Sequence, residues 1–366
     1  TGVALVVVMI CTTFLSHRQS REASANTVRP GPAYFSLLAI VLAGVTTWFN
    51  TSQSNCPLAF VAVAIVLTLS VYALGVAELA LLAQTLAFVG HVLWQGNLFD
   101  HGAPRWWNPL MMIGMTLGLG HWWQRQTRLK TGENVAPAMQ FVWALAMVGL
   151  VIAWLGRTCA DPTWLGLASL LAVGVTVYAA ATRAWMLAAC AQLFLLPALW
   201  LFFAQLSTGA EPRFIPLAPI ATLGMLSYFW VKQRSGARPE MHDSLSMLAT
   251  VYRWVALAMS LWWVLEYIPE REQIWVLTLV GLMVFLAAGA LRSREAQLIS
   301  AVFSGTALVL FGLRAWDAGF GYLPNLLAVL IWLGQQRIAK RQPAHFGFHD
   351  GTHHAICQGV KRFRVL

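Results

Sequence analysis

The chain has 366 residues, of which 58% are hydrophobic and only 10% are charged, and its formal net charge is +10. An ordinary soluble domain carries about 25% charged residues, so this composition excludes a soluble globular protein. It also argues against a nucleic-acid-binding module, because no soluble segment presents a basic face interleaved with exposed aromatic residues.

Charged residues are absent from long parts of the chain. Neither Pro30 to Ala77 nor Ala184 to Ala210 contains an Asp, Glu, Lys or Arg, and an apolar run of about 18 residues or more predicts a membrane-spanning helix. Many of the 18 Trp residues lie near segment ends, as in the interfacial belt of membrane proteins. We therefore predict an all-α, polytopic integral membrane protein.

Thirteen segments are predicted to span the membrane. In chain order they are Gly2–Leu15, Tyr34–Phe49, Leu58–Val76, Leu79–Gly96, Asn108–Trp123, Pro137–Leu155, Trp164–Ala181, Trp185–Leu206, Ile215–Val231, Leu248–Leu265, Ile274–Leu291, Ala296–Leu313 and Gly321–Gln336. After the first segment, they group into three four-helix blocks with a period of about 105 to 111 residues, which predicts an internal repeat.

The third segments of the three blocks align without gaps, with Trp94, Trp200 and Phe311 in register near their ends. Because four is an even number, each block enters and leaves on the same side, so the repeats are predicted to be parallel. The predicted organisation is residues 1–31 (last helix of a truncated preceding repeat, with a cytoplasmic loop), 32–133, 134–243 and 244–342 (repeats 1 to 3), and 343–366 (polar tail). We expect the chain to be part of a longer protein.

Basic residues are distributed unequally between the two predicted sides of the membrane. Nineteen of the 24 Lys and Arg residues fall on one side and five on the other, whereas the 14 acidic residues divide equally. The positive-inside rule therefore predicts that the basic loops and the C-terminal tail are cytoplasmic. Membrane lipids are the expected partners, and nucleic acid is not.

No Asp, Glu, Lys or Arg lies near the middle of a predicted segment, which argues against a proton-driven pump and most ion-coupled carriers. His91 is the one exception among ionisable residues, and Asp100, His101 and Arg105 follow it. These four residues are candidates for a reacting cluster, since His and a carboxylate share protons or bind metals. Their spacing matches no metal signature, so neither a metal nor a cofactor is expected; the alternative is a His near the interface beside a polar loop.

Each predicted outer loop between the third and fourth helix of a block carries one acid and one Arg. The pairs are Asp100 with Arg105, Glu211 with Arg213, and Asp317 with Arg314. They are candidates for the rim of a shared outer vestibule. The alternative is that each pair merely solvates its loop, because surface ion pairs are common and weak.

Two cysteines occupy corresponding positions in the first two repeats. Cys56 and Cys159 each follow the first helix of their block and precede a proline. An oxidising outer side would allow a disulfide between them, but the sequence does not give the geometry that such a bond requires. Both a bridge and two separate thiols stay open.

The repeated four-helix block, the turn around Arg294-Glu295-Ala296 and the helix end Trp332-Leu333-Gly334 together resemble a family of large, uncharacterised bacterial multi-pass membrane proteins known as a domain of unknown function. The resemblance implies a bacterial inner-membrane location and a longer parent protein. It defines no functional residues.

Two classes of function stay open. The favoured one is a non-enzymatic transporter, channel or lipid-handling envelope scaffold, whose substrate is a small molecule or a lipid. The alternative is a membrane-embedded enzyme that acts on a lipid-linked substrate at the outer face through His91, Asp100, His101 and Arg105. The sequence does not set the oligomeric state.

Overall fold

The computed structural model of the chain describes residues 2–20, 30–74, 76–101, 105–125, 135–208, 214–234, 242–291 and 294–318, together with 330, 331 and 334. Across these residues the regular structure is helical, with no strand. The chain divides into two compact units, Thr1–Ala249 and Thr250–Leu366, and each is described separately.

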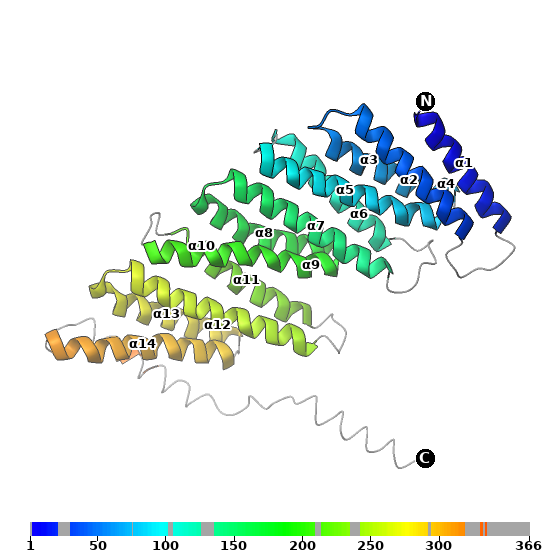
Figure 1. The fold of residues 1–366 in the computed structure, drawn as a ribbon. Coiled ribbons are helices and arrows are strands. Elements are labelled where there is room, and N and C mark those ends of the chain that lie inside the picture. The colour runs from blue at the N-terminus through cyan, green and yellow to red at the C-terminus, as the bar shows by residue number, and fades with distance from the viewer. Residues whose placement is uncertain are drawn as a thin grey trace, which may run out of the picture. The chain divides into compact units, whose positions relative to one another are not determined.

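The described helices follow one another through short connections (Figure 1). They are α1 (Gly2–Ser20), α2 (Pro30–Asn50), α3 (Cys56–Leu69), α4 (Val71–Leu74), α5 (Ala77–His101), α6 (Trp107–Arg125), α7 (Val135–Thr158), α8 (Asp161–Ala181), α9 (Trp185–Ala191), the 3-10 helix η1 (Gln192–Phe194), α10 (Leu195–Thr208), α11 (Leu217–Arg234), α12 (His242–Tyr267), α13 (Glu270–Leu291) and α14 (Arg294–Ala318).

Eight helical stretches of the described chain are long and apolar enough to cross a membrane. They are Pro32–Asn50, Cys56–Leu74, Ala77–Asp100, Val135–Thr158, Asp161–Ala181, Trp185–Ser207, His242–Tyr267 and Ala296–Arg314. The shorter apolar stretches Gly2–Ser16 and Glu272–Leu286 fall below that length. The expectation of an all-helical protein with many apolar helices is confirmed, while the count of thirteen spans stays a prediction.

Twelve of the thirteen predicted segments fall on helices of the structure. The last, Gly321–Gln336, lies outside the described residues except at 330, 331 and 334. Large apolar side chains remain exposed on the outside of the helices: Phe49 is 80% exposed, Trp200 75% and Leu170 68%. Patches of this kind are rare on soluble monomers, and a lipid environment accounts for them.

Breaks in the helices have local chemical causes. The stretch from Trp185 to Thr208 tightens into η1 just before Pro197, whose missing N–H leaves the carbonyl of Leu193 without its helical partner. Between α8 and α9 the backbone of Arg183 is left-handed, with φ 60°. There the N–H of Ala184 donates to Ala179 O at 2.7 Å, which closes the helix with the bond of a Schellman motif.

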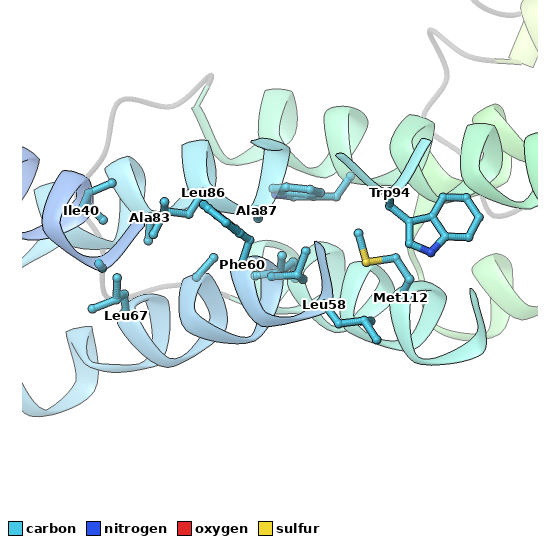
Figure 2. Packing of buried hydrophobic residues seen from close by; sticks show 14 of the residues in the cluster. Ile40, Leu58, Phe60, Leu67, Ala83, Leu86, Ala87, Trp94 and Met112 are labelled. Carbon is cyan, nitrogen blue, oxygen red and sulfur yellow. The ribbon is translucent and has the colours of Figure 1, made fainter. Parts of the chain in front are cut away.

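The core of the first unit forms where α5 packs against α2, α3 and α6. Figure 2 shows side chains of α5, including Leu86 and Ala87, facing Leu58 and Phe60 of α3. α3 and α5 approach closely at Gly90, where an added Cβ would lie 2.8 Å from Pro57 O. The glycine therefore fixes the distance between these two helices.

The second unit has its own apolar cluster, made by Leu257, Val264, Leu277, Phe303 and Ala307. Its helices α13 and α14 also meet through polar groups, because Ser300 Oγ donates to Gly281 O at 2.7 Å. A Cβ on Gly281 would lie 2.8 Å from Ser304 Oγ. Small residues thus allow close helix contact, as in other membrane proteins.

Candidate functional site: buried polar groups and a groove of the first unit

The structure does not bring together His91 and Asp100 of the predicted reacting cluster. His91 is buried on α5, with 4% of its surface exposed, whereas the side chains of Asp100 and Arg105 are exposed. Asp100 lies nine residues further along the same helix, which at 1.5 Å per residue is roughly 13 Å along the axis. The side chain of His101 lies outside the described residues.

The predicted vestibule can be followed only in part. Arg314 donates to Glu270 O and, at 2.8 Å, to Gln273 Oε1, so its guanidinium ties α14 to α13. Glu211, Arg213 and the side chain of Asp317 lie outside the described residues. The vestibule therefore stays a prediction.

The two candidate disulfide cysteines are both free thiols in the structure. Cys56 is buried at the start of α3, and Cys159 is half-buried, with its sulfur 3.9 Å from Thr158 Oγ1. The structure does not join them.

Glu78 lies in the first turn of α5, near the end of a predicted span, where a carboxylate is expected to be solvated by water and lipid headgroups. The structure buries it instead: 9% of its surface is exposed, and its Oε2 has no hydrogen-bond partner among the described residues. The expectation of a solvated side chain was wrong for this residue, because α5 starts inside the helix bundle and not beyond it.

Gln84 of α5 is the centre of a buried hydrogen-bond network. Its Nε2 donates to Thr68 Oγ1 at 2.9 Å and to Ala80 O at 2.8 Å. Its Oε1 accepts from Trp123 Nε1 at 3.2 Å and from Trp143 Nε1 at 3.0 Å. Both hydrogens of the amide and both acceptor positions are thus used. One side chain connects α3, α5, α6 and α7.

His91 forms a second polar link, two turns further along α5. Its Nε2 lies 2.9 Å from Thr116 Oγ1, and Thr116 donates its own hydroxyl hydrogen to Met112 O at 2.6 Å. Thr116 must therefore accept from His91, which places the proton on Nε2. The Nδ1 atom is buried and has no partner among the described residues. This arrangement is a neutral helix-to-helix contact, which favours the alternative that a buried His has a structural role.

The link between Thr68 and Gln84 recurs in the second part of the first unit. Gln192 Nε2 donates to Thr176 Oγ1 at 2.9 Å and to Ala188 O at 2.9 Å. Thr68 and Thr176 each donate to the carbonyl oxygen four residues earlier. Thr68 and Thr176 are 108 positions apart, and so are Gln84 and Gln192. The same type of polar contact therefore occurs in two helix pairs.

This recurrence differs from the register expected from the sequence. Trp94 is 3% exposed and donates to Asn108 Oδ1 at 2.8 Å, whereas Trp200, its expected counterpart, is 75% exposed. The residue 108 positions after Trp94 is Phe202, which is fully buried. Shifting the alignment of the two blocks by two residues therefore pairs one buried residue with another, which the alignment of Trp94 with Trp200 does not.

An open groove runs between α3 and α6, and we call it the α3–α6 groove. It has a volume of about 450 Å³. Its walls are Ile65, Thr68, Leu69, Leu110, Met111, Gly114, Met115, Gly118, Leu119 and Trp122. None of these residues is charged. A Cβ added at Gly114 or Gly118 would meet no atom within 4 Å, so these small residues make room and do not pack against another described helix.

The sequence reasoning did not identify Gln84, Thr116 or the groove as parts of a site. Of the three glycines of α6, Gly114 and Gly118 have open Cβ positions, whereas a Cβ on Gly120 would lie 3.7 Å from Trp143 Cβ. The Gln84 network could have been found from the equal spacing of 16 residues between Thr68 and Gln84 and between Thr176 and Gln192. Among the described residues, no three His, Cys, Asp or Glu side chains come together as a metal site would require.

These features define a class of protein: its described residues are helical, include eight helices suited to crossing a membrane, and have buried polar side chains that bond to one another. Compared with protein-family models, curated proteins and solved structures, the chain matches none. Its function must therefore be argued from its own residues.

Proposed function

We propose that the chain is a non-enzymatic, lipid-handling scaffold of a bacterial inner membrane, and that it holds one lipid acyl chain in the α3–α6 groove. The observation that carries the proposal is the groove itself, about 450 Å³ of open space on helices suited to crossing a membrane. A bilayer leaves no such space empty, and the uncharged walls offer contact to hydrocarbon.

The size of the groove favours an acyl chain over a second helix. A methylene group takes up roughly the ~30 Å³ of a water molecule, so about 450 Å³ holds a chain of common length. A helix is about 10 Å across and would not enter a groove of this volume. Leu110 and Met111, 48% and 51% exposed, give a lipid chain direct access from the side.

The proposed topology has thirteen spans in three parallel four-helix repeats after one leading helix, with the basic loops in the cytoplasm. Support comes from the distribution of Lys and Arg and from the recurrence of the Thr68–Gln84 contact as Thr176–Gln192. The same polar link occurs in one helix pair of each of the first two proposed repeats.

An enzyme that acts on a lipid-linked substrate is not favoured by any contact. That alternative needs His91 and Asp100 to act on one substrate, and they lie at different depths on α5. A transporter or channel would need a polar path, whereas Gln84, Trp94 and His91 Nε2 of α5 bond to neighbouring helices.

Native mass spectrometry after gentle release from the membrane tests the proposal. We expect one phospholipid per chain in the unaltered protein and loss of that lipid from Gly118→Leu, whose side chain would fill the groove. Gly224→Leu is the matched control, because Gly224 also has open space at its Cβ but lies on α11, away from the groove. Equal lipid retention by both variants would contradict the proposal. A dimer that can be cross-linked in the unaltered protein and in Gly224→Leu but not in Gly118→Leu would also contradict it, because the groove would then be a contact between two copies.

A further inference from the structure

A second cavity lies at the junction of α2, α3 and α5, and we call it the Trp48 cavity. It has a volume of about 360 Å³ and is lined by Trp48, Thr51, Gln53, Cys56 and Asn97, with two apolar side chains. It shares no residue with the α3–α6 groove. The two cavities are therefore separate candidates for binding.

The position of the Trp48 cavity is that of a membrane interface. Three candidate spans end beside it, since one ends at Asn50, the next begins at Cys56 and the third ends at Asp100. Trp48 is 53% exposed, and Trp is the residue typical of the headgroup level of a bilayer. A molecule in this cavity would lie where lipid headgroups lie.

The polar groups of the cavity are uncharged and offer both donors and acceptors. Asn97 Nδ2 donates to Gln53 O at 3.3 Å, and Thr51 Oγ1 donates to Thr47 O at 2.6 Å. The Oδ1 of Asn97, the lone pairs of Thr51 and the Nε1 of Trp48 have no partner among the described residues. Amides and hydroxyls pair best with groups that also donate and accept, such as sugar hydroxyls.

The absence of charge from this lining selects against an ionic ligand. No Lys or Arg lines the cavity, so a phosphate would be taken from water without a cation to balance it. The N-terminus of α3 is the only positive dipole end among the described walls, and its cap residue Asn55 makes no side-chain bond to it. A helix N-terminus without a basic residue beside it can bind a neutral ligand with hydroxyl groups as well as it can bind an anion.

We propose that the Trp48 cavity binds one sugar ring, carried as the headgroup of a neutral glycolipid. Its volume of about 360 Å³ corresponds to about twelve water molecules at ~30 Å³ each, which leaves room for one sugar ring. Trp48 supplies an aromatic face at the rim, and Asn97 and Thr51 supply the hydrogen bonds. This site extends the proposed lipid-handling function to headgroup recognition, but it does not depend on an acyl chain in the α3–α6 groove.

The test is native mass spectrometry of the full chain with three probes: monoglucosyl dioleoylglycerol, dioleoylphosphatidylglycerol and methyl glucoside. We expect the glucolipid to bind one to one and at least tenfold better than the phospholipid. Trp48→Leu and Asn97→Leu should each weaken glucolipid binding by tenfold or more. Trp106→Leu is the control, because Trp106 is equally a surface tryptophan, 74% exposed, outside the cavity.

Binding of methyl glucoside with similar strength would support the sugar site and assign it to free sugar as well as lipid. Stronger binding of the phospholipid, or glucolipid binding that neither variant changes, would overturn the proposal. Circular dichroism checks that each variant folds. If Trp48→Leu does not fold, the binding measured with Asn97→Leu decides. Gly118→Leu must leave glucolipid binding intact, so failure of the groove proposal and failure of this one are distinguishable.

Discussion

The Gln84 network gives the sharpest prediction of stability. Gln84→Met keeps a similar volume but removes four hydrogen bonds, two given and two accepted, at distances of 2.8 to 3.2 Å. Hydrogen bonds between membrane helices are worth about 0.6 kcal/mol on average, and two buried indole N–H groups would lose their partner. We expect a loss of about 2 to 3 kcal/mol, or roughly 30- to 150-fold in the unfolding equilibrium.

Reversible unfolding in mixed micelles, followed by circular dichroism, measures this loss. Gln95→Met is the matched control, since Gln95 lies on the same helix, is half-buried and makes no hydrogen bond among the described residues. It should change stability by under about 0.5 kcal/mol, as a substitution away from such features does. Equal effects of the two substitutions would refute the reasoning. A double-mutant cycle with Trp143→Phe should show coupling, because the two residues share a bond.

Three further substitutions test local geometry. Arg183→Gly should stabilise the protein by about 1 kcal/mol in the same assay, because glycine tolerates the left-handed backbone at φ 60°; a loss would argue against that turn. Gly90→Ala should destabilise by more than about 1 kcal/mol while Gly96→Ala does not, since only the first added Cβ meets a backbone oxygen, at 2.8 Å. Thr116→Val should cost about 1 kcal/mol by removing the acceptor of the His91 N–H, with Thr116→Ser restoring it; no difference between Val and Ser would contradict the assigned contact.

The sequence predicted the helices because membrane spans need long charge-free runs. Such runs can be recognised without knowing how the segments pack. Pro30–Asn50 and Asp161–Ala181 are helices in the structure close to where the apolar runs suggested them. These are properties of a single segment, independent of its neighbours.

What the sequence did not reveal depends on how segments face one another. The sequence aligned Trp94 with Trp200 because both are tryptophans, although the first is buried and the second is exposed. The burial of Glu78 depends on where α5 begins inside the bundle. Rotation of each helix about its axis decides these outcomes, and alternative rotations are equally compatible with an all-apolar helix.

The central claim, that the α3–α6 groove holds a lipid chain, is tested most directly by photo-crosslinking. A phospholipid with a diazirine on one acyl chain, incorporated into membranes that contain the full chain, would be irradiated and the labelled residues mapped by mass spectrometry. The account predicts labels concentrated at groove residues such as Met111, Met115 and Leu69. Labels spread evenly over other outward-facing side chains, such as Leu170 and Val177, would contradict it.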